Sequence, residues 1–290
     1  MKTANKQSGR TLVEMTVVIA AIVLLGGFGL PAVRTFLDSF ESGTGARPVI
    51  SAALASARAI AAREQRYAGI RFQKVYNSND ILNPLGGVLE AAQYMVFIVQ
   101  NPDMMAWGFQ AVEGLKPMKL PDNLGVMDLT IVTNRNVSNP VNSQQARLDD
   151  PSFTPAQKDN WLSNISTLTD ISTFSIIFSP SGKLVIHGIR IRNRDGEGDS
   201  VSFTDFSMDD IFNKKAKVEA GIGMFYQDDY FAAPLDLGLG PEPSRRSFII
   251  YDRREFKRAY ERSQAYSGYL VKLISDAIYI NPYTGTMIEK

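Results

Sequence analysis

The chain contains no cysteine among its 290 residues. Disulfide bonds and thiolate chemistry are therefore excluded, although a chain without cysteine fits a reducing or an oxidising compartment equally well. The net charge is also close to zero, at +1. The sequence therefore shows no excess of basic residues of the kind that proteins binding nucleic acid usually carry as a stripe or patch. We therefore expect no nucleic acid among the partners.

Side chains and motifs that carry catalysis are equally scarce. His187 is the only histidine and lies in a predicted strand, where a lone imidazole is typical of a structural residue rather than a general base. The sequence has no Gly-x-Ser-x-Gly nucleophile motif, no phosphate-binding loop and no dinucleotide fingerprint. The neighbours Asp228 and Asp229 would point to opposite faces of a strand, so we expect both to be solvated. The sequence predicts neither an enzyme nor a cofactor.

One long apolar run lies near the amino terminus. The 19 residues from Met15 to Val33 carry no charge, and as a helix they would cover about 28 Å, close to the hydrocarbon thickness of a bilayer. Lys2, Lys6 and Arg10 precede the run, with no acidic residue among them. The positive-inside bias then predicts a cytoplasmic amino terminus and an extracytoplasmic body.

A carboxylate, Glu14, stands at the start of this run. A secretory signal peptide usually has an apolar core of roughly 7 to 15 residues followed by a small-x-small cleavage site. Here the core is longer, and Ala32 lies beside Pro31 and further apolar residues. A carboxylate near the bilayer is costly and is normally kept only with a partner. The sequence thus favours a membrane segment in which Glu14 is paired, over a signal peptide or an uncleaved signal anchor.

Gly9, the segment Thr11–Met15 and the apolar run to Pro31 resemble the prepilin leader of type IV pilins and type II secretion pseudopilins. The resemblance implies cleavage by a prepilin peptidase between Gly9 and Arg10, with methylation of the new amine on Arg10. It also implies that Glu14, the fifth residue of the mature chain, pairs with the terminal amine of a neighbouring subunit. Pro31 falls where the family often has a helix-kinking proline. The family usually has phenylalanine where this chain has Arg10.

The segment 41–48 is rich in glycine and ends in proline, so it predicts a hinge. A second helix is predicted over 49–66. Its apolar stripe should pack on a sheet, and its arginines Arg58, Arg63 and Arg66 should face solvent. The residues of the stripe are Ile50, Ala53, Leu54, Ala57, Ile60 and Ala61.

Short segments rich in aromatic and β-branched residues follow, which predicts an antiparallel meander after the helix. Those before the middle of the chain are 67–72, 93–99, 107–112 and 124–132, and the later ones are 173–178, 183–191, 247–251, 269–274 and 277–280. The turn Ser179–Gly182 predicts a hairpin between 173–178 and 183–191. Asp252 and Glu255 have the spacing of a capping box and predict a helix after 247–251.

Three body segments, Glu64–Phe72, Leu120–Leu124 and Ile177–Gly182, resemble the H-type minor pseudopilins, the GspH and FimT group. The resemblance implies an α+β, pilin-like fold in which a long N-terminal transmembrane and assembly helix precedes a second helix packed on antiparallel sheet. The implied parts are a leader (1–9), the assembly helix (10–40), the hinge (41–48) and a periplasmic globular domain (49–290). The chain departs from that group in size, with insertions near 134–170 and 207–245.

The first insertion is polar and predicts an exposed loop with one short helix at most. That helix is predicted from Thr154 as its cap, with Pro155 at the first helical position and Gln157 three residues after the cap. Trp161 and Leu162 can anchor it. The second insertion predicts a helix over 208–217. Surface decoration and partner recognition both stay open for these insertions.

The stretch 193–199 has some of the features of a metal-binding loop. Asn193, Asp195, Glu197 and Asp199 place oxygen ligands at alternate positions around a glycine, as a calcium loop does. The twelfth position of such a loop would be Thr204 instead of a bidentate glutamate. A charged turn is therefore favoured over a calcium site.

Taken with the resemblance, these patterns predict a structural minor pseudopilin or pilin-like subunit and not an enzyme. The expected partners are other pilin or pseudopilin subunits, the prepilin peptidase and an inner-membrane assembly platform. The precursor would lie in the inner membrane with a cytoplasmic amino terminus and a periplasmic domain, and would then join a pseudopilus or pilus. The alternative is an uncleaved, membrane-tethered extracytoplasmic binding protein or enzyme.

Overall fold

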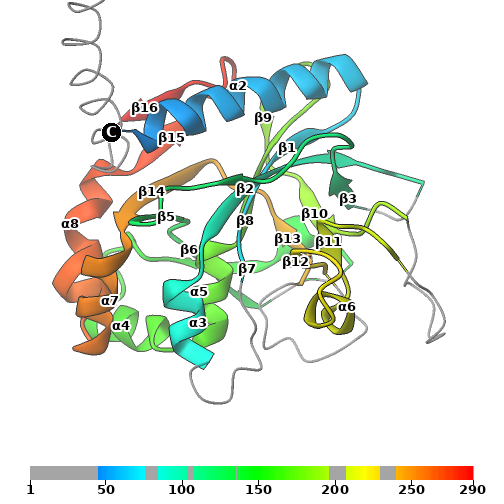
Figure 1. Cartoon of the computed structure of the whole chain (residues 1–290). Helices are drawn as coiled ribbons and strands as arrows, with labels where there is room; N and C mark the ends of the chain where they lie inside the picture. The colour runs from blue at the N-terminus through cyan, green and yellow to red at the C-terminus, as the bar shows by residue number, and fades with distance from the viewer. Residues whose placement is uncertain are drawn as a thin grey trace, which may run out of the picture. The chain divides into compact units, whose positions relative to one another are not determined.

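The computed structural model describes residues 45–75, 84–103, 107–134, 136, 138–195, 207–228 and 240–289. Two compact units divide the chain, Met1–Gly45 and Ala46–Lys290, and the elements below belong to the second (Figure 1). A search of the helices in the described ranges finds none with the length and apolarity needed to cross a membrane.

The described part of the chain mixes helices and strands along its whole length. The helices are α2 (Ala46–Glu64), α3 (Pro84–Glu90), η1 (Pro140–Asn142), α4 (Pro155–Leu162), α5 (Ile165–Ser172), α6 (Lys215–Glu219), α7 (Arg253–Glu261), the π-helix η3 (Ala265–Leu270), α8 (Val271–Leu273) and η4 (Ile274–Asp276). The strands are β1 (Ala68–Lys74), β2 (Gln93–Gln100), β3 (Gly108–Ala111), β4 (Met118–Lys119), β5 (Leu124–Met127), β6 (Thr130–Asn134), β7 (Gln144–Arg147), β8 (Phe174–Phe178), β9 (Leu184–Val185), β10 (Gly188–Ile191), β11 (Phe212–Asn213), β12 (Phe225–Tyr226), β13 (Glu242–Pro243), β14 (Ser247–Asp252), β15 (Ile278–Ile280) and β16 (Met287–Glu289).

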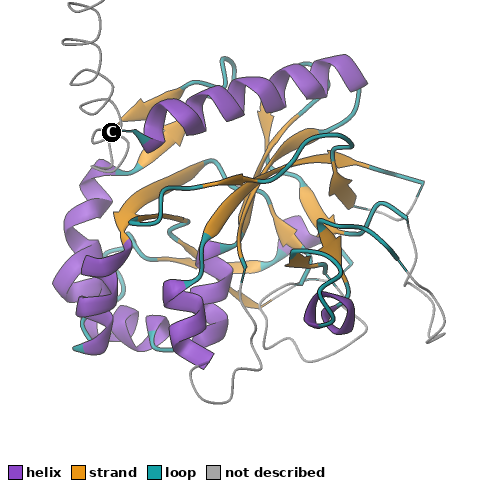
Figure 2. Ribbon diagram, in the orientation of Figure 1, coloured by secondary structure: helices purple, strands orange, loops and turns teal. Residues whose placement is uncertain are grey.

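The described strands form two main sheets and two small ones of two strands each, β6-β7 and β11-β12. The larger main sheet has the order β13-β10-β3-β2-β1-β8-β9, with β4 pairing to β2 beside this path. Neighbouring strands within this sheet are antiparallel, except for β10 and β3, which are parallel. The smaller sheet, β16-β15-β14-β5, is antiparallel throughout. The predicted α+β class agrees with this arrangement (Figure 2).

Helix α2 lies across the strands, at the top of Figure 1. The six residues of its predicted apolar stripe are all buried, and they pack in one core with residues of β1, β8 and β14 such as Phe72, Phe174 and Phe248. The prediction of a helix packed on sheet is therefore confirmed. The helix begins at Ala46 and not at Val49, because Pro48 falls in the first turn, where a missing N–H breaks no helical hydrogen bond. The last part of the predicted hinge 41–48 is thus helical.

The buried side chain of Gln93 bridges the two sheets. Its Nε2 donates to the carbonyl oxygens of Val126 and Ser172, at 2.7 Å each. Its Oε1 accepts from the Val126 amide at 2.7 Å. The side-chain amide therefore bonds both backbone groups of Val126, as a neighbouring strand would, and so links β2 of the larger sheet to β5 of the smaller one.

Two predicted strands are each divided in the structure. The segment 124–132 forms β5 and β6, which belong to different sheets. The segment 183–191 forms β9, which completes the hairpin with β8, and β10, which leaves it to pair with β3. In the first case the neighbouring apolar stretches serve different sheets, and in the second they pair with different strands of the larger sheet. A pattern of alternation along one segment does not reveal such a change of partner.

The strand predicted over 269–274 is wrong, since this segment continues from the π-helix into α8. Short apolar runs do not discriminate between a strand and a buried helix by periodicity alone. Here Leu270 is fully buried in a second core, together with Tyr266 and Phe256. The strand predicted over 277–280 is confirmed as β15.

The first insertion is more ordered than an exposed loop. It supplies η1, β7, α4 and α5, and Leu148, Leu162 and Leu168 are buried in the second core. The predicted capping box of α4 is present, with Thr154 Oγ1 accepting from the Gln157 amide. Polar composition hid the apolar residues that α4 and α5 turn inward. In the second insertion, the segment predicted as a helix over 208–217 forms β11 followed by α6.

Candidate functional site

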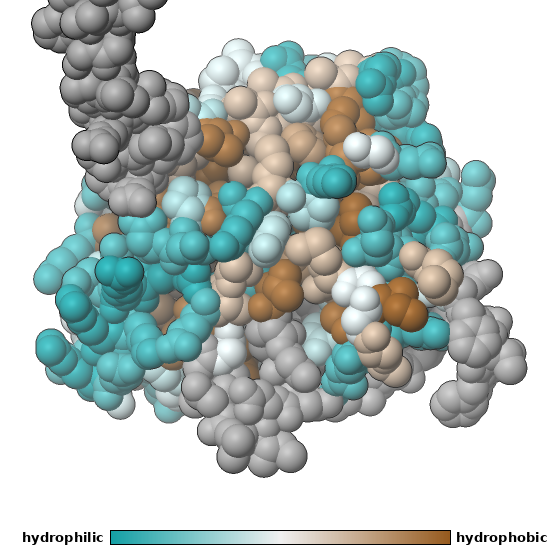
Figure 3. Space-filling view, in the orientation of Figure 1, coloured by the Kyte–Doolittle hydropathy of each residue, from teal (hydrophilic) through white to brown (hydrophobic). Residues whose placement is uncertain are grey.

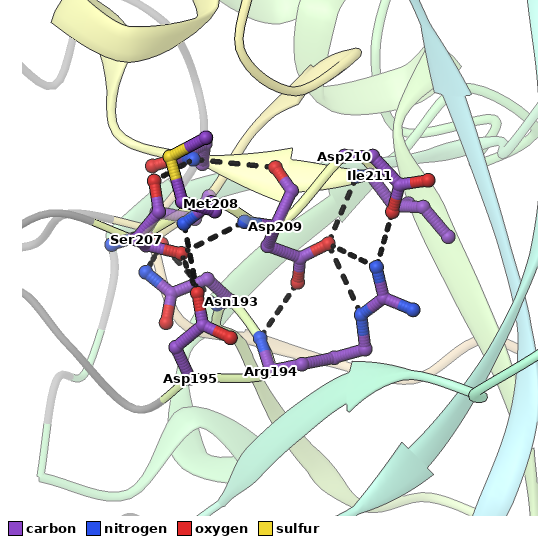
Figure 4. A network of polar contacts seen from close by, with 10 residues as sticks. Asn193, Arg194, Asp195, Ser207, Met208, Asp209, Asp210 and Ile211 are labelled. Carbon is purple, nitrogen blue, oxygen red and sulfur yellow. Dashed lines mark hydrogen bonds and ion pairs between the residues drawn. The ribbon is translucent and has the colours of Figure 1, made fainter.

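The predicted processing and assembly residues, Gly9, Arg10, Glu14 and Pro31, lie outside the described residues. Of the four calcium candidates, Glu197 and Asp199 also lie outside them, whereas Asn193 and Asp195 are described. Among the described residues, the candidate site is therefore the polar network around Asp195, which is drawn in Figure 4.

Asp195 joins the two chain segments on either side of 196–206. Its Oδ2 accepts from Ser207 Oγ at 2.6 Å and from the Met208 amide at 2.9 Å. Figure 4 shows this carboxylate directed at Ser207 and Met208. The contact fixes the end of the stretch after β10 against the segment that leads into β11.

A second carboxylate, that of Asp209, has no exposed surface and is surrounded by donors. Its Oδ2 accepts from the Arg194 amide at 2.6 Å, and its Oδ1 accepts from Arg194 Nη2 and from the Ile211 amide, at 2.9 Å each. Arg194 also pairs with Asp210. We call this group (Arg194, Asp195, Ser207, Asp209 and Asp210) the Arg194 clasp.

The clasp does not have the form of a metal site in the described residues. Its carboxylates accept from protein N–H and O–H groups, and Asn193 directs its side-chain amide at Gln227 Oε1, 2.9 Å away. A search of the described ranges finds no group of three or more histidines and carboxylates that would hold a metal ion. The favoured turn fits this geometry. The calcium hypothesis stays a prediction, since two of its ligands are not described.

Buried ion pairs form a network that the sequence analysis missed. Arg71 of β1 pairs with Glu242 of β13 at 2.8 Å and donates to Ser175 Oγ at 3.1 Å. Arg245 pairs with Asp128. Burial raises the pKa of the Asp128 carboxyl above its usual range, and the charge of Arg245 opposes this shift. The available signal was the placement of Arg71 within a strand whose alternate residues are apolar. The network thus links β13, the end strand of the larger sheet, to β1 and β8 of the same sheet.

Asp228 is another buried carboxylate, which corrects the expectation that it is solvated. It is 3% exposed and lies 3.6 Å from Arg190, while Arg192 donates to its backbone carbonyl. The residue follows β12, and its backbone amide donates to the Ile191 carbonyl of β10, which places it beside that strand. Asp229 lies outside the described residues.

His187 has the surroundings of a structural residue. Its ring lies 4.2 Å from the ring of Tyr67 and 5.2 Å from that of Trp107, measured between centroids. Its Nδ1 lies 2.6 Å from the Gly188 carbonyl. Burial lowers the pKa of the imidazole, so it is neutral at neutral pH. Its role is packing at the end of β10.

The outward face of α2 is a candidate assembly surface. From Ser51 to Ala62 its exposed residues are all small: Ser51, Ala52, Ala55, Ser56, Ala59 and Ala62. The surface over α2, along the top of Figure 3, is accordingly mostly pale to tan. Small side chains allow another helix to approach closely.

Arg58 does not point into solvent from this face, contrary to the prediction. Its Nε donates to the Gly182 carbonyl at 2.8 Å and its Nη1 to the Thr284 carbonyl at 2.7 Å. Gly182 and Gly285 have φ of +75° and +70°, so both turns need glycine for their backbone conformation. Arg58 thus fastens α2 to the hairpin turn of the larger sheet and to the last turn of the smaller one.

Comparisons with protein-family models, with characterised proteins and with solved structures gave no match for this chain.

Proposed function

We propose that the chain is a structural minor pseudopilin or pilin-like subunit of a type II secretion pseudopilus or a type IV pilus. The observation that carries the proposal is the amino-terminal sequence, in which Gly9 and Glu14 precede an uncharged run that ends near Pro31. In this proposal a prepilin peptidase cuts after Gly9 and frees the amine of Arg10. The amino-terminal segment then leaves the bilayer by packing among the segments of neighbouring subunits.

The described domain supports the proposal through the order of its elements. Helix α2 begins at Ala46, directly after the unit that contains the apolar run. It buries one face on antiparallel strands and leaves a face of small residues exposed. A subunit that assembles through helices needs such a face, since long charged side chains there would hold neighbouring helices apart.

Glu14 supplies the specificity in this mechanism. A carboxylate among apolar helices is destabilising unless a cation pairs with it, and the attraction is strong where water is excluded. The amine of Arg10 in a neighbouring subunit would be that cation. Each added subunit would therefore stop at the register in which its carboxylate meets an amine.

Processing is tested by the intact mass of the protein expressed together with a prepilin peptidase. The expected product lacks residues 1–9, with or without one added methyl group on Arg10. A Gly9→Leu variant should keep the full mass, because its side chain blocks the scissile position. A full-length mass for the unaltered chain would instead favour the alternative of an uncleaved, tethered binding protein or enzyme.

Assembly is tested by Glu14→Leu, which should leave membrane insertion intact yet reduce incorporation into filaments. Crosslinking of sheared filaments followed by immunoblotting measures incorporation. Glu64→Leu is the matched control, because this carboxylate lies at the end of α2 and contacts only neighbouring arginines. Equal incorporation of both variants would contradict the pairing role of Glu14.

A further inference from the structure

Lys74, the last residue of β1, is a buried lysine without a carboxylate partner in the described structure. The residue is 5% exposed, and its Nζ donates to the backbone carbonyl of Val88 at 2.6 Å. That carbonyl belongs to the last turn of α3, where orphan carbonyls accept such bonds. Lys74 therefore fastens the end of α3 to the central sheet.

A second buried cation, Arg253, holds the same helix end. It is 9% exposed and donates to the backbone carbonyls of Glu90 and Asp122. Its Nε is buried without a hydrogen-bond partner. No ion pair joins either Lys74 or Arg253 to a carboxylate among the described residues. Two basic side chains thus face one helix end without an ion-paired carboxylate among the described residues.

The other charged groups around α3 are engaged elsewhere. The Glu90 carboxylate turns to Lys257 on α7, and Asp122 pairs with Lys119 at 2.6 Å. Helix α5 packs against both α3 and β1, and its carboxylate Asp170 has polar contacts of its own. Burial, and secondly the charge of Arg253, lower the pKa of Lys74 to about 7.

We propose that Lys74 and Arg253 form a pH-operated latch on α3, which is closed while Lys74 is neutral and loosens as Lys74 takes up a proton. The neutral amine keeps its bond to Val88 without placing a second charge beside Arg253. A proton on Lys74 is bound far more readily when α3 opens and the amine reaches water. Proton uptake therefore pulls the equilibrium toward the open form.

The sign and range follow from linkage. The opened helix has Lys74 in water with an ordinary pKa near 10.5, against about 7 in the closed form. Between these values the open form binds more protons, so opening increases as the pH falls. From pH 9 to pH 7 the opening equilibrium should rise roughly 50-fold, and below pH 7 it should level off because the closed form is protonated as well.

Two backbone amides report on the latch. The Ala91 amide donates to the Gly87 carbonyl within the end of α3, and the Val75 amide donates to the Ala92 carbonyl just beyond Lys74. Hydrogen exchange of the full-length chain in detergent, corrected for the intrinsic pH dependence of exchange, should show their protection falling roughly 50-fold from pH 9 to pH 7. Protection that is equal at the two pH values would overturn the proposal.

Three variants separate a titrating latch from ordinary packing. Lys74→Met keeps the volume and should make protection of both amides independent of pH. Arg253→Gln removes the neighbouring charge, so the fall between pH 9 and pH 7 should become smaller. Lys158→Met removes a different buried lysine, which bonds Tyr266, and should leave the wild-type fall unchanged. A fall that persists in Lys74→Met would refute the role of Lys74.

Discussion

Arg58 offers the sharpest test of how α2 is held on the fold, through the variant Arg58→Ala. The change removes two hydrogen bonds from a charged guanidinium to carbonyl oxygens, those of Gly182 and Thr284. Such bonds contribute about 1.5 to 3 kcal/mol each when protected from water. Since Arg58 is only half-buried, we halve this figure and expect a loss of about 2 kcal/mol in unfolding free energy.

Thermal unfolding of the full-length chain in detergent measures this loss. For a domain of this size, about 2 kcal/mol corresponds to a lower Tm by roughly 4 to 8 °C. Arg63→Ala is the matched control on the same helix, because its side chain is 71% exposed and pairs only with the neighbouring Glu64. Its unfolding free energy should change by less than about 0.5 kcal/mol.

A second readout shows whether the loss arises at the turns. The amides of Gly182 and Gly285 donate within their own turns, so both should exchange faster in Arg58→Ala and at the wild-type rate in Arg63→Ala. Arg58→Lys should be intermediate, because an ammonium has no planar fork to reach two carbonyls at once. Equal Tm values for the two alanine variants would refute the reasoning.

Further predictions concern the buried contacts of the sheets. Arg245→Met should lower the unfolding free energy by about 3 to 5 kcal/mol, because Asp128 would be left buried without its cation; adding Asp128→Asn should restore part of it in denaturant unfolding. Gly69→Ala should prevent folding, since its Cβ would lie 2.0 Å from the Ile176 carbonyl oxygen, as loss of the cooperative transition would show. Thr154→Ala should cost about 1 kcal/mol through loss of the cap of α4.

Local signals in the sequence predicted the longest elements, α2, α7 and the strands β1, β2, β8 and β14, at their observed places. The stripe of α2 has a helical period over a long segment, and its buried residues follow from that period alone. Caps and turns could be predicted equally well, because Thr154, Asp252 and Gly182 form hydrogen bonds with residues only a few positions away. At α7 the cap is present, although the Asp252 amide bonds the Tyr269 hydroxyl instead of the Glu255 side chain that a full capping box requires.

Contacts between distant segments were not predictable in the same way. Gln93 and Arg58 look like ordinary polar residues in a strand and a helix, and their roles depend on carbonyls far along the chain. The same holds for Lys74, whose burial follows from α3 and α7 closing over the end of β1. In the described candidate site, Asp195 was identified from the sequence as a possible oxygen ligand for a metal. Its carboxylate instead accepts two hydrogen bonds from the protein, which could not be predicted without knowing where Ser207 lies.

If the chain is the filament subunit proposed above, these distant contacts determine how force on α2 is passed to the two sheets. Force applied to the start of α2 would reach both sheets through the core that its buried stripe shares with them, and through the two bonds of Arg58. Gln93 joins the same two sheets at a separate place. Because the two sheets share a core and are also joined by these polar contacts, neither sheet would turn about a single contact when α2 is pulled. A helix fastened in this way would move with its domain as one body, which suits an assembly held together through its helices.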